Sequence, residues 1–141
     1  MATNAEPDLL VDTSVAIALV VADHEAHART TDALGTRTLG LAGHAWFETY
    51  SALTRLPPPA RRRPSEVARL LAHNFPSSRF LHAHAQEALA ARLAGLGVAG
   101  GSVYDALVGA AAHHHGLPLA TRDTRAVGLY RVLEVNVEML A

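Results

Sequence analysis

The chain has 141 residues, of which 50% are hydrophobic and 18% are charged. This balance excludes a disordered protein and predicts one globular domain, residues 1–141. There is no cysteine, which excludes disulfides, thiolate metal sites and cysteine nucleophiles. The formal net charge of −1 means that no overall basic field favours nucleic acid, although every cation in the chain is an arginine.

The predicted elements alternate between strands and helices along the chain. Strands are predicted at residues 8–11, 38–41, 79–81, 117–120 and 132–135, from short apolar runs. Helices are predicted at 15–21, 24–34, 44–56, 64–74, 86–96, 103–115 and 124–129, the fourth after a proline turn and the sixth ending at Gly116. This order predicts an α/β fold, with a central parallel sheet flanked by helices on both faces.

No apolar run approaches the roughly 20 residues that span a bilayer. Residues 1–7 carry only one charge, Glu6, and lack the basic start of a secretory signal. We therefore expect no membrane contact and a cytoplasmic location.

Four carboxylates occupy positions from which they can converge. Asp12 and Asp123 each follow a predicted strand, whereas Asp105 and Glu48 lie in the first turns of predicted helices. Open parallel sheets place their sites at the carboxyl ends of the strands, where such helices also begin. Four carboxylates in one pocket repel each other, and oxygen-only ligands favour a hard cation, Mg²⁺ or Mn²⁺. Such an ion can promote phosphodiester cleavage.

Each acid also has a simpler structural interpretation. Asp12 and Asp123 are favoured caps of the helices that follow them. Ser102 and Asp105 fit the spacing of a capping box, and Glu48 fits a solvated helix position.

At this point four segments resemble a known family. They are LLVDTSVAIA (9–18), WFETYSALTR (46–55), VYDALVGAAA (103–112) and LATRDTRA (119–126), each with its acid. They are similar in order and spacing to the PIN domain, and more narrowly to VapC-type toxins of toxin–antitoxin modules. The resemblance covers essentially the whole chain.

The resemblance implies a Mg²⁺-dependent endoribonuclease that inhibits growth or translation by cleaving RNA. It maps the metal-site acids onto the four carboxylates and supporting hydroxyls onto Thr13 or Ser14, and onto Thr121. It also implies a small VapB-type antitoxin as partner and a homodimer. A further acid that some members carry after the fourth is absent, since Thr124, Arg125 and Ala126 stand there.

Several other functions remain open at the level of sequence. A phosphatase of the haloacid-dehalogenase type normally has a second Asp two residues after the first, where this chain has Ser14. A receiver-like signalling domain relies on a lysine, and the chain has none. A housekeeping PIN nuclease for RNA processing and an inactive PIN-like binding module are further alternatives.

Five arginines are candidates for RNA contacts. Arg55 lies seven residues after Glu48, on the same face of the predicted helix, and Arg122 lies next to Asp123. Arg61, Arg62 and Arg63 follow the proline turn, where they can grip an RNA backbone or form a solvated loop.

Two further patterns favour structural roles. The glycines at 95, 97 and 100 match G-x-G-x-x-G, but they follow a predicted helix, which indicates a helix stop and a loop instead of a dinucleotide site. The side chains of His113, His114 and His115 cannot all face one ion on a helix, so a polar helix end is expected. His82 and His84 are expected on one face of a partly exposed strand edge.

Overall fold

The computed structural model describes residues 8–141; the expectation about residues 1–7 lies outside this range. The strands are β1 (Leu9–Val11), β2 (Leu39–Leu41), β3 (Leu119–Thr121) and β4 (Val137–Met139). The helices are α1 (Thr13–Val20), α2 (His27–Leu34), α3 (His44–Thr54), α4 (Pro64–Asn74), α5 (Ala83–Arg92), α6 (Ser102–His115) and α7 (Thr124–Val132).

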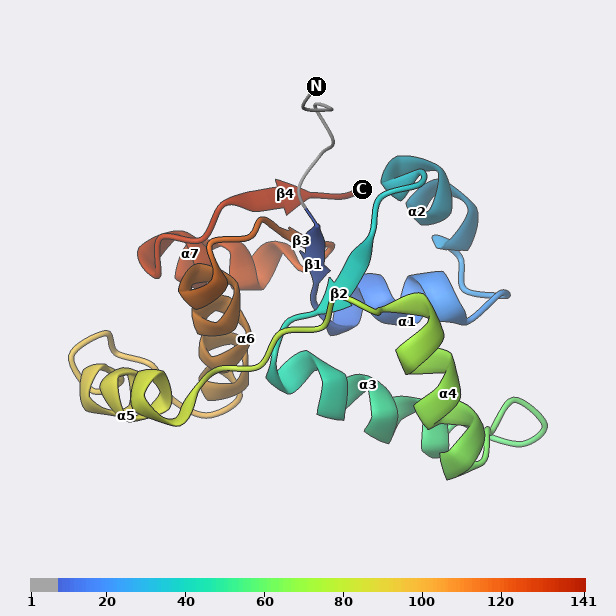
Figure 1. Ribbon diagram of the computed structural model, residues 1–141, viewed down its shortest axis with the longest axis horizontal. Helices are drawn as coiled ribbons and strands as arrows, with labels where there is room; N and C mark the ends of the chain where they lie inside the picture. Colours follow the sequence, from blue (N-terminus) through green and yellow to red (C-terminus); the bar gives the residue numbers. More distant parts are fainter. Residues whose placement is uncertain (1–7) are drawn as a thin grey trace, which may run out of the picture.

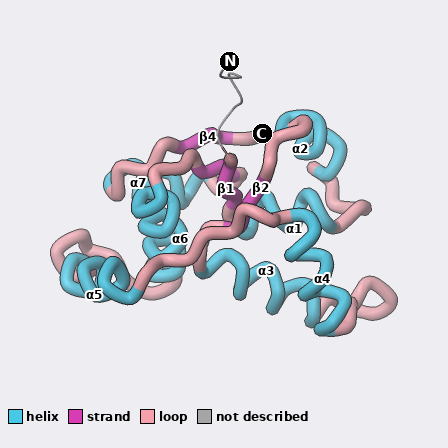
Figure 2. Tube along the Cα trace, in the orientation of Figure 1, coloured by secondary structure: helices cyan, strands magenta, loops and turns pink. Residues whose placement is uncertain are grey.

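The strands form one parallel sheet in the order β2-β1-β3-β4. Strand β1 therefore lies between β2 and β3, with Leu10 opposite Gly40 on one side and Leu119 on the other. In Figure 1, α1, α2 and α4 lie to the right of β1 and α5, α6 and α7 lie to its left. Figure 2 shows how little of the chain is strand compared with helix. The predicted α/β class with a parallel sheet is confirmed.

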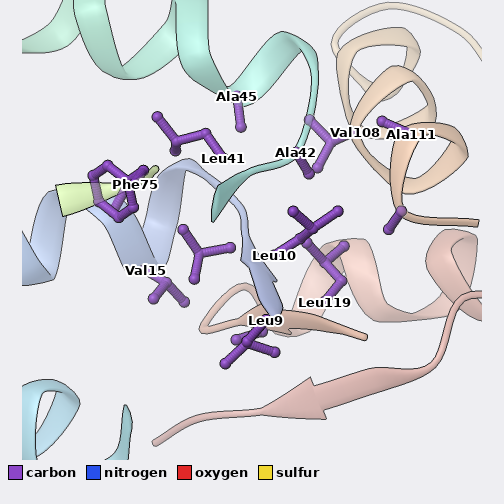
Figure 3. Close-up of a cluster of buried hydrophobic side chains, with 14 of the residues drawn as sticks. Leu9, Leu10, Val15, Leu41, Ala42, Ala45, Phe75, Val108, Ala111 and Leu119 are labelled. Atoms are coloured by element: carbon purple, nitrogen blue, oxygen red, sulfur yellow. The ribbon is translucent and has the colours of Figure 1, made fainter. Parts of the chain in front are cut away.

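The hydrophobic core surrounds the central strand. Leu9, Leu10 and Val11 of β1 are all at most 1% exposed, as expected for a strand that is covered on both faces. Figure 3 shows Leu10 between Leu41 of β2 and Leu119 of β3, with α3 and α6 beside them. The buried β1 fixes the position of the residue that follows it, Asp12.

The predicted strand at residues 79–81 is wrong, since only Arg79 forms an isolated bridge, with Ala42. The segment still runs along the outer edge of β2, but the backbone N–H of Leu41 donates to the Ser78 hydroxyl (3.0 Å) in place of a backbone carbonyl. Gly40 permits this close approach, because an added Cβ would lie 2.2 Å from the Ser77 carbonyl oxygen. The Ser78 hydroxyl thus replaces a backbone carbonyl as acceptor at one position along the edge of β2.

The last predicted strand, at residues 132–135, is also wrong. Helix α7 continues to Val132, and the strand forms later, at Val137–Met139. Leu133 and Val135 are buried, but they lie in the turn between these two elements.

Helix α5 begins before the predicted start at residue 86. Consequently His82 precedes the first turn of α5 and His84 lies within it, so neither is on the expected strand. The glycine-rich segment follows α5 as a loop, in which Gly97 and Gly100 have positive φ angles. Within residues 8–141, no helix is both long enough and apolar enough to cross a bilayer.

Candidate active site in an acidic cleft

The fold brings the four predicted acids to one place. Asp12 directly follows β1, and Asp123 follows the neighbouring strand β3. Asp105 lies in the first turn of α6, and Glu48 lies in α3. All four line one open cleft of about 580 Å³. The complete lining is Asp12, Thr13, Ser14, Glu48, Gly101, Ser102, Tyr104, Asp105, Val108, Asp123, Arg125 and Tyr130.

Asp12 is the most enclosed of the acids, at 4% exposed. Its Oδ1 accepts hydrogen bonds from the Ser14 hydroxyl (2.6 Å) and the Val15 backbone N–H (3.3 Å). Its Oδ2 accepts from the hydroxyls of Thr121 and Tyr130. A carboxylate has about four acceptor positions, so these donors hold both oxygens in a fixed orientation.

Two of these hydroxyls are themselves oriented by the backbone. The N–H of Arg122 donates to the Ser14 hydroxyl oxygen (2.9 Å), and the N–H of Asp123 donates to the Thr121 hydroxyl oxygen (3.0 Å). Each hydroxyl thus accepts from the chain and donates its own hydrogen to Asp12. Asp12 is thereby linked to the turn that carries Asp123.

The other acids have less support. Thr13 donates to the Glu48 carboxylate (3.2 Å). Asp123 accepts from the backbone N–H of Arg125 (3.0 Å) and pairs with its guanidinium (3.3 Å), while the Arg125 side chain is 91% exposed. No hydrogen bond to the Asp105 carboxylate is found within residues 8–141.

The electrostatics of the cleft favour a cation. Burial raises the pKa of the Asp12 carboxyl, although its four hydrogen bonds oppose the shift. The pKa of Asp105 is raised by burial first and then by the negative charges of Asp123, Glu48 and Asp12, with Arg125 opposing. A divalent cation among these oxygens would remove the repulsion, and the donor set suits a hard ion.

The capping interpretations divide between the acids. Asp12 and Asp123 are the N-caps of α1 and α7. For these two acids, the capping role and the role in the cleft therefore apply to the same side chain. The predicted capping box of Ser102 and Asp105 is wrong, because α6 is preceded by Gly101 and has no side-chain cap. The Asp105 carboxylate has therefore no structural task of this kind.

The predicted arginines are not among the residues that line the cleft. Arg55 is exposed at the end of α3, and Arg122 donates to the carbonyl of Ala141 at the carboxyl terminus. In the loop before α4, Arg61 donates to the Leu56 carbonyl.

The two remaining arginines of this loop have partners of different kinds. Arg62 donates to the carbonyl of Val20 (3.3 Å), and Arg63 pairs with Glu66 (2.7 Å). A role for the loop in contacting RNA at a distance from the acids stays a prediction.

Arg125, Tyr104 and Tyr130 are among the residues of the cleft that were not predicted from the sequence as site residues. Tyr130 is 1% exposed and reaches Asp12 because Gly109 of α6 leaves room for its ring. A Cβ at Gly109 would lie 2.9 Å from Cδ1 of Tyr130. The glycine inside an otherwise apolar helix was the available signal of a close contact.

A comparison with known families agrees with this geometry. The family model of the PIN domain matches residues 9–132. The chain belongs to the PIN domain family.

Two relatives narrow the resemblance, within the PIN domain family, to VapC-type proteins. The chain is 46% identical to Ribonuclease VapC27 of Mycobacterium tuberculosis over 136 residues, which cover 96% of this chain and 99% of that protein. It is also 46% identical to Ribonuclease VapC40 of the same species, over 92% of this chain and 96% of the relative. The resemblance of this PIN domain to VapC-type proteins is confirmed.

Structures with lower identity share the fold. The crystal structure of VapBC2 from Rickettsia felis, bound to a promoter DNA fragment, has a TM-score of 0.69 at 12% identity and covers 96% of this chain and all of that one. The structure of M. tuberculosis VapC20, described as a toxin that cleaves the Sarcin-Ricin loop, has a TM-score of 0.66 at 20% identity, with coverages of 86% and 94%.

Proposed function

We propose that this protein is a metal-dependent endoribonuclease and the toxin of a VapBC-type pair. The observation that carries the proposal is the convergence of Asp12, Glu48, Asp105 and Asp123 in one cleft of a PIN domain. The 46% identity to two proteins named as ribonucleases supports RNA as the substrate. The chain acts as one domain, and its site of action is the cytoplasm.

The four carboxylates would hold Mg²⁺, with Mn²⁺ as the natural substitute. A divalent ion bound there would supply a water of lowered pKa and positive charge beside the leaving oxygen of the phosphodiester. Asp12 is a pre-oriented ligand, because Ser14 and Thr121 fix its two oxygens. Asp105 is the most available ligand, because its carboxylate is not engaged in hydrogen bonds within residues 8–141.

The protein also has groups that can position an RNA strand. Arg125 lines the cleft with its side chain 91% exposed, where its guanidinium could contact a phosphate of the RNA. Thr13 keeps the Glu48 carboxylate turned toward the cleft. In the hydrolysis, the oxygen of the attacking water bonds to phosphorus and the phosphorus–oxygen bond to the leaving nucleotide breaks. The attacking water gives up a proton, and the leaving oxygen takes one up from solvent.

The partner of this toxin is a small VapB-type antitoxin, and the active toxin is a homodimer. Two similar folds come from complexes described as VapBC, from Rickettsia felis and Salmonella typhimurium, which supports an antitoxin partner. Size measurement of the purified chain, alone and with the product of a neighbouring short gene, tests both statements.

A phosphatase with Asp12 as nucleophile is less favoured. Asp12 is 4% exposed, and both of its oxygens accept two hydrogen bonds. In addition, Ser14 stands where such a phosphatase has its second Asp, and its hydroxyl donates to Asp12. The second carboxylate that this phosphatase chemistry uses is therefore absent from that position.

Cleavage of RNA by the purified chain tests the proposal. We expect cleavage with Mg²⁺ or Mn²⁺ and none after chelation. Asp105→Asn should lower the rate more than about 100-fold, because it removes a charged ligand without removing hydrogen bonds. Asp32→Asn, an exposed carboxylate on α2, is the matched control and should cleave normally. Equal activity of the folded Asp105→Asn variant, or cleavage that persists without a divalent ion, would overturn the assignment.

A further inference from the structure

Three histidines form a compact group at the end of α6 that is opposite to the acidic cleft. His114 and His115 belong to the last turn of α6, and His82 precedes the first turn of α5. The ring centroid of His82 lies 4.7 Å from that of His114 and 5.4 Å from that of His115. The ring centroids of His114 and His115 are 4.9 Å apart. Two segments far apart in the sequence therefore meet through imidazoles.

The ligand atoms of this group are closer together than those of the acids. Each of the three rings can offer one nitrogen, and these nitrogens all lie within 4.8 Å of one another. Among the residues that the structure describes, it is the one group of three or more histidine, aspartate or glutamate side chains with this property. The four carboxylates instead surround a wider cleft.

We propose that His82, His114 and His115 form a binding site for a divalent transition metal ion of the Zn²⁺ type. Three neutral imidazoles and one open position are the donor set of many tetrahedral zinc sites. Nitrogen ligands of Zn²⁺ lie about 3.3 Å apart, so the rings must close by up to about 1.5 Å. His82 and His114 are exposed, so rotation of their side chains can supply this movement without disturbing the core.

One of the three rings is already oriented for binding. The Nε2 of His115 lies 2.8 Å from the carbonyl oxygen of Phe80. A carbonyl only accepts, so Nε2 carries the hydrogen, and in the neutral ring Nδ1 is the nitrogen that can bind an ion. A backbone carbonyl that accepts from the second ring nitrogen is the usual support of a metal-binding histidine.

The chemistry of the ligand atoms should make the site selective. The group offers imidazole nitrogens and no carboxylate oxygen, so it should discriminate against Mg²⁺, which prefers oxygen.

The site is separate from the acidic cleft and does not depend on the proposed nuclease activity. His114 and Asp105 are about 14 Å apart along α6, at a rise of 1.5 Å per residue. In Figure 1, α5 lies at the outer edge of the molecule, where it contacts α6. A bound ion would fasten the start of α5 to the end of α6.

Titration of Zn²⁺ into the full chain, without a purification tag and with excess Mg²⁺ to fill the cleft, tests the site. We expect one tight equivalent of Zn²⁺ per chain. The affinity should fall more than about 100-fold in the double variant His82→Ala, His114→Ala, because two of three ligands are lost. Co²⁺ should give the visible absorption of a tetrahedral nitrogen site in the parent chain and not in this variant.

Two neighbouring histidines serve as matched controls. His84→Ala on α5 and His113→Ala on α6 change exposed rings outside the group and should leave the Zn²⁺ affinity unchanged. Circular dichroism without metal should show that all variants fold, since the substituted side chains are exposed. Unchanged Zn²⁺ affinity in the double variant would overturn the proposal. Loss of tight binding in Asp105→Asn but not in the double variant would assign the ion to the cleft and overturn it as well.

Discussion

Helix α6 carries a group of possible metal ligands at each end, and the two groups are built differently. At its beginning, four carboxylates surround a cleft, and one of them, Asp12, is held by four hydrogen bonds. At its end, three imidazoles lie ring against ring, with a single hydrogen bond from His115 to the Phe80 carbonyl. Carboxylates repel at neutral pH, whereas neutral imidazoles can touch. The charge of the ligands therefore determines how closely the fold can assemble them before an ion binds.

The largest expected effect is that substitutions separate RNA cleavage from Zn²⁺ binding. Asp105→Asn should lower the rate of RNA cleavage by more than about 100-fold and leave Zn²⁺ binding intact. The double variant His82→Ala, His114→Ala should do the reverse, with cleavage in Mg²⁺ unchanged. Parallel cleavage assays and Zn²⁺ titrations of the two variants measure this. If either variant lost both properties while remaining folded, the two regions would not be independent.

The next effect separates two acids of the same cleft. Asp12→Asn should lower the free energy of unfolding by about 2–4 kcal/mol, because an amide nitrogen cannot accept from the hydroxyls that point at it. Asp105→Asn has no such bonds to lose within residues 8–141. Chemical denaturation of both variants in metal-free buffer measures the difference. Equal losses of stability would show that the donors around Asp12 are not what distinguishes it.

Gly109→Ala should affect the acidic cleft through Tyr130. The added Cβ would meet the Tyr130 ring at 2.9 Å and Leu133 at 3.1 Å, so these side chains must move. We expect a loss of about 1–3 kcal/mol of stability from overpacking, together with slower cleavage, because the Tyr130 hydroxyl leaves Asp12. Gly128→Ala on α7, where nothing lies within 4 Å, is the control. Unchanged stability and activity in Gly109→Ala would mean that α7 adjusts without cost.

The smallest effect concerns pH. The raised pKa of Asp105 means that the folded state binds this proton more tightly than the unfolded state, so its contribution to stability falls as pH rises from 3.8 through the raised value. Without metal, Asp105→Asn should therefore be more stable than the parent chain at pH 7. The gain should be below about 1 kcal/mol, or about 4 °C in Tm, because the group is partly exposed.

Two conditions should remove this gain. It should shrink as the pH approaches 4, because Asp105 of the parent chain then becomes protonated as well. It should reverse with saturating Mg²⁺, because only the parent chain keeps all four ligands. Thermal unfolding at pH 4 and pH 7, with and without Mg²⁺, measures both. A gain of equal size at the two pH values would point to a cause other than charge.

Much of the fold could be predicted from periodicity and from helix signals. Residues 64–74 form α4 as predicted, with Pro64 at its start, and Gly116 ends α6 in a left-handed conformation. The short apolar run at 132–135 could not be assigned, because so few residues fit the end of a helix as well as a strand. At Arg79 the outcome depended on one hydroxyl, Ser78, which occupies a position in the ladder of β2.

The site was predictable to the extent that topology alone determined it. The positions of Asp12 and Asp123 after neighbouring parallel strands predicted that they would meet. The direction of long side chains is not encoded in such a pattern, so the arginines of the proline loop were proposed and Arg125 was missed. The histidine group was not predicted for a related reason. Only two members of the triplet, His114 and His115, contact the ring of His82, which lies just before α5.

The hydrogen bonds around Asp12 have a consequence for the evolution of this protein. Donors from α1, β3 and α7 all converge on this one carboxylate, whereas Asp105 holds nothing in place within the described part of the chain. Selection for a folded protein alone would thus preserve Asp12, and only selection for catalysis would preserve Asp105. A descendant that had given up cleavage and kept only its binding role would be recognised by substitution at Asp105 beside an intact Asp12.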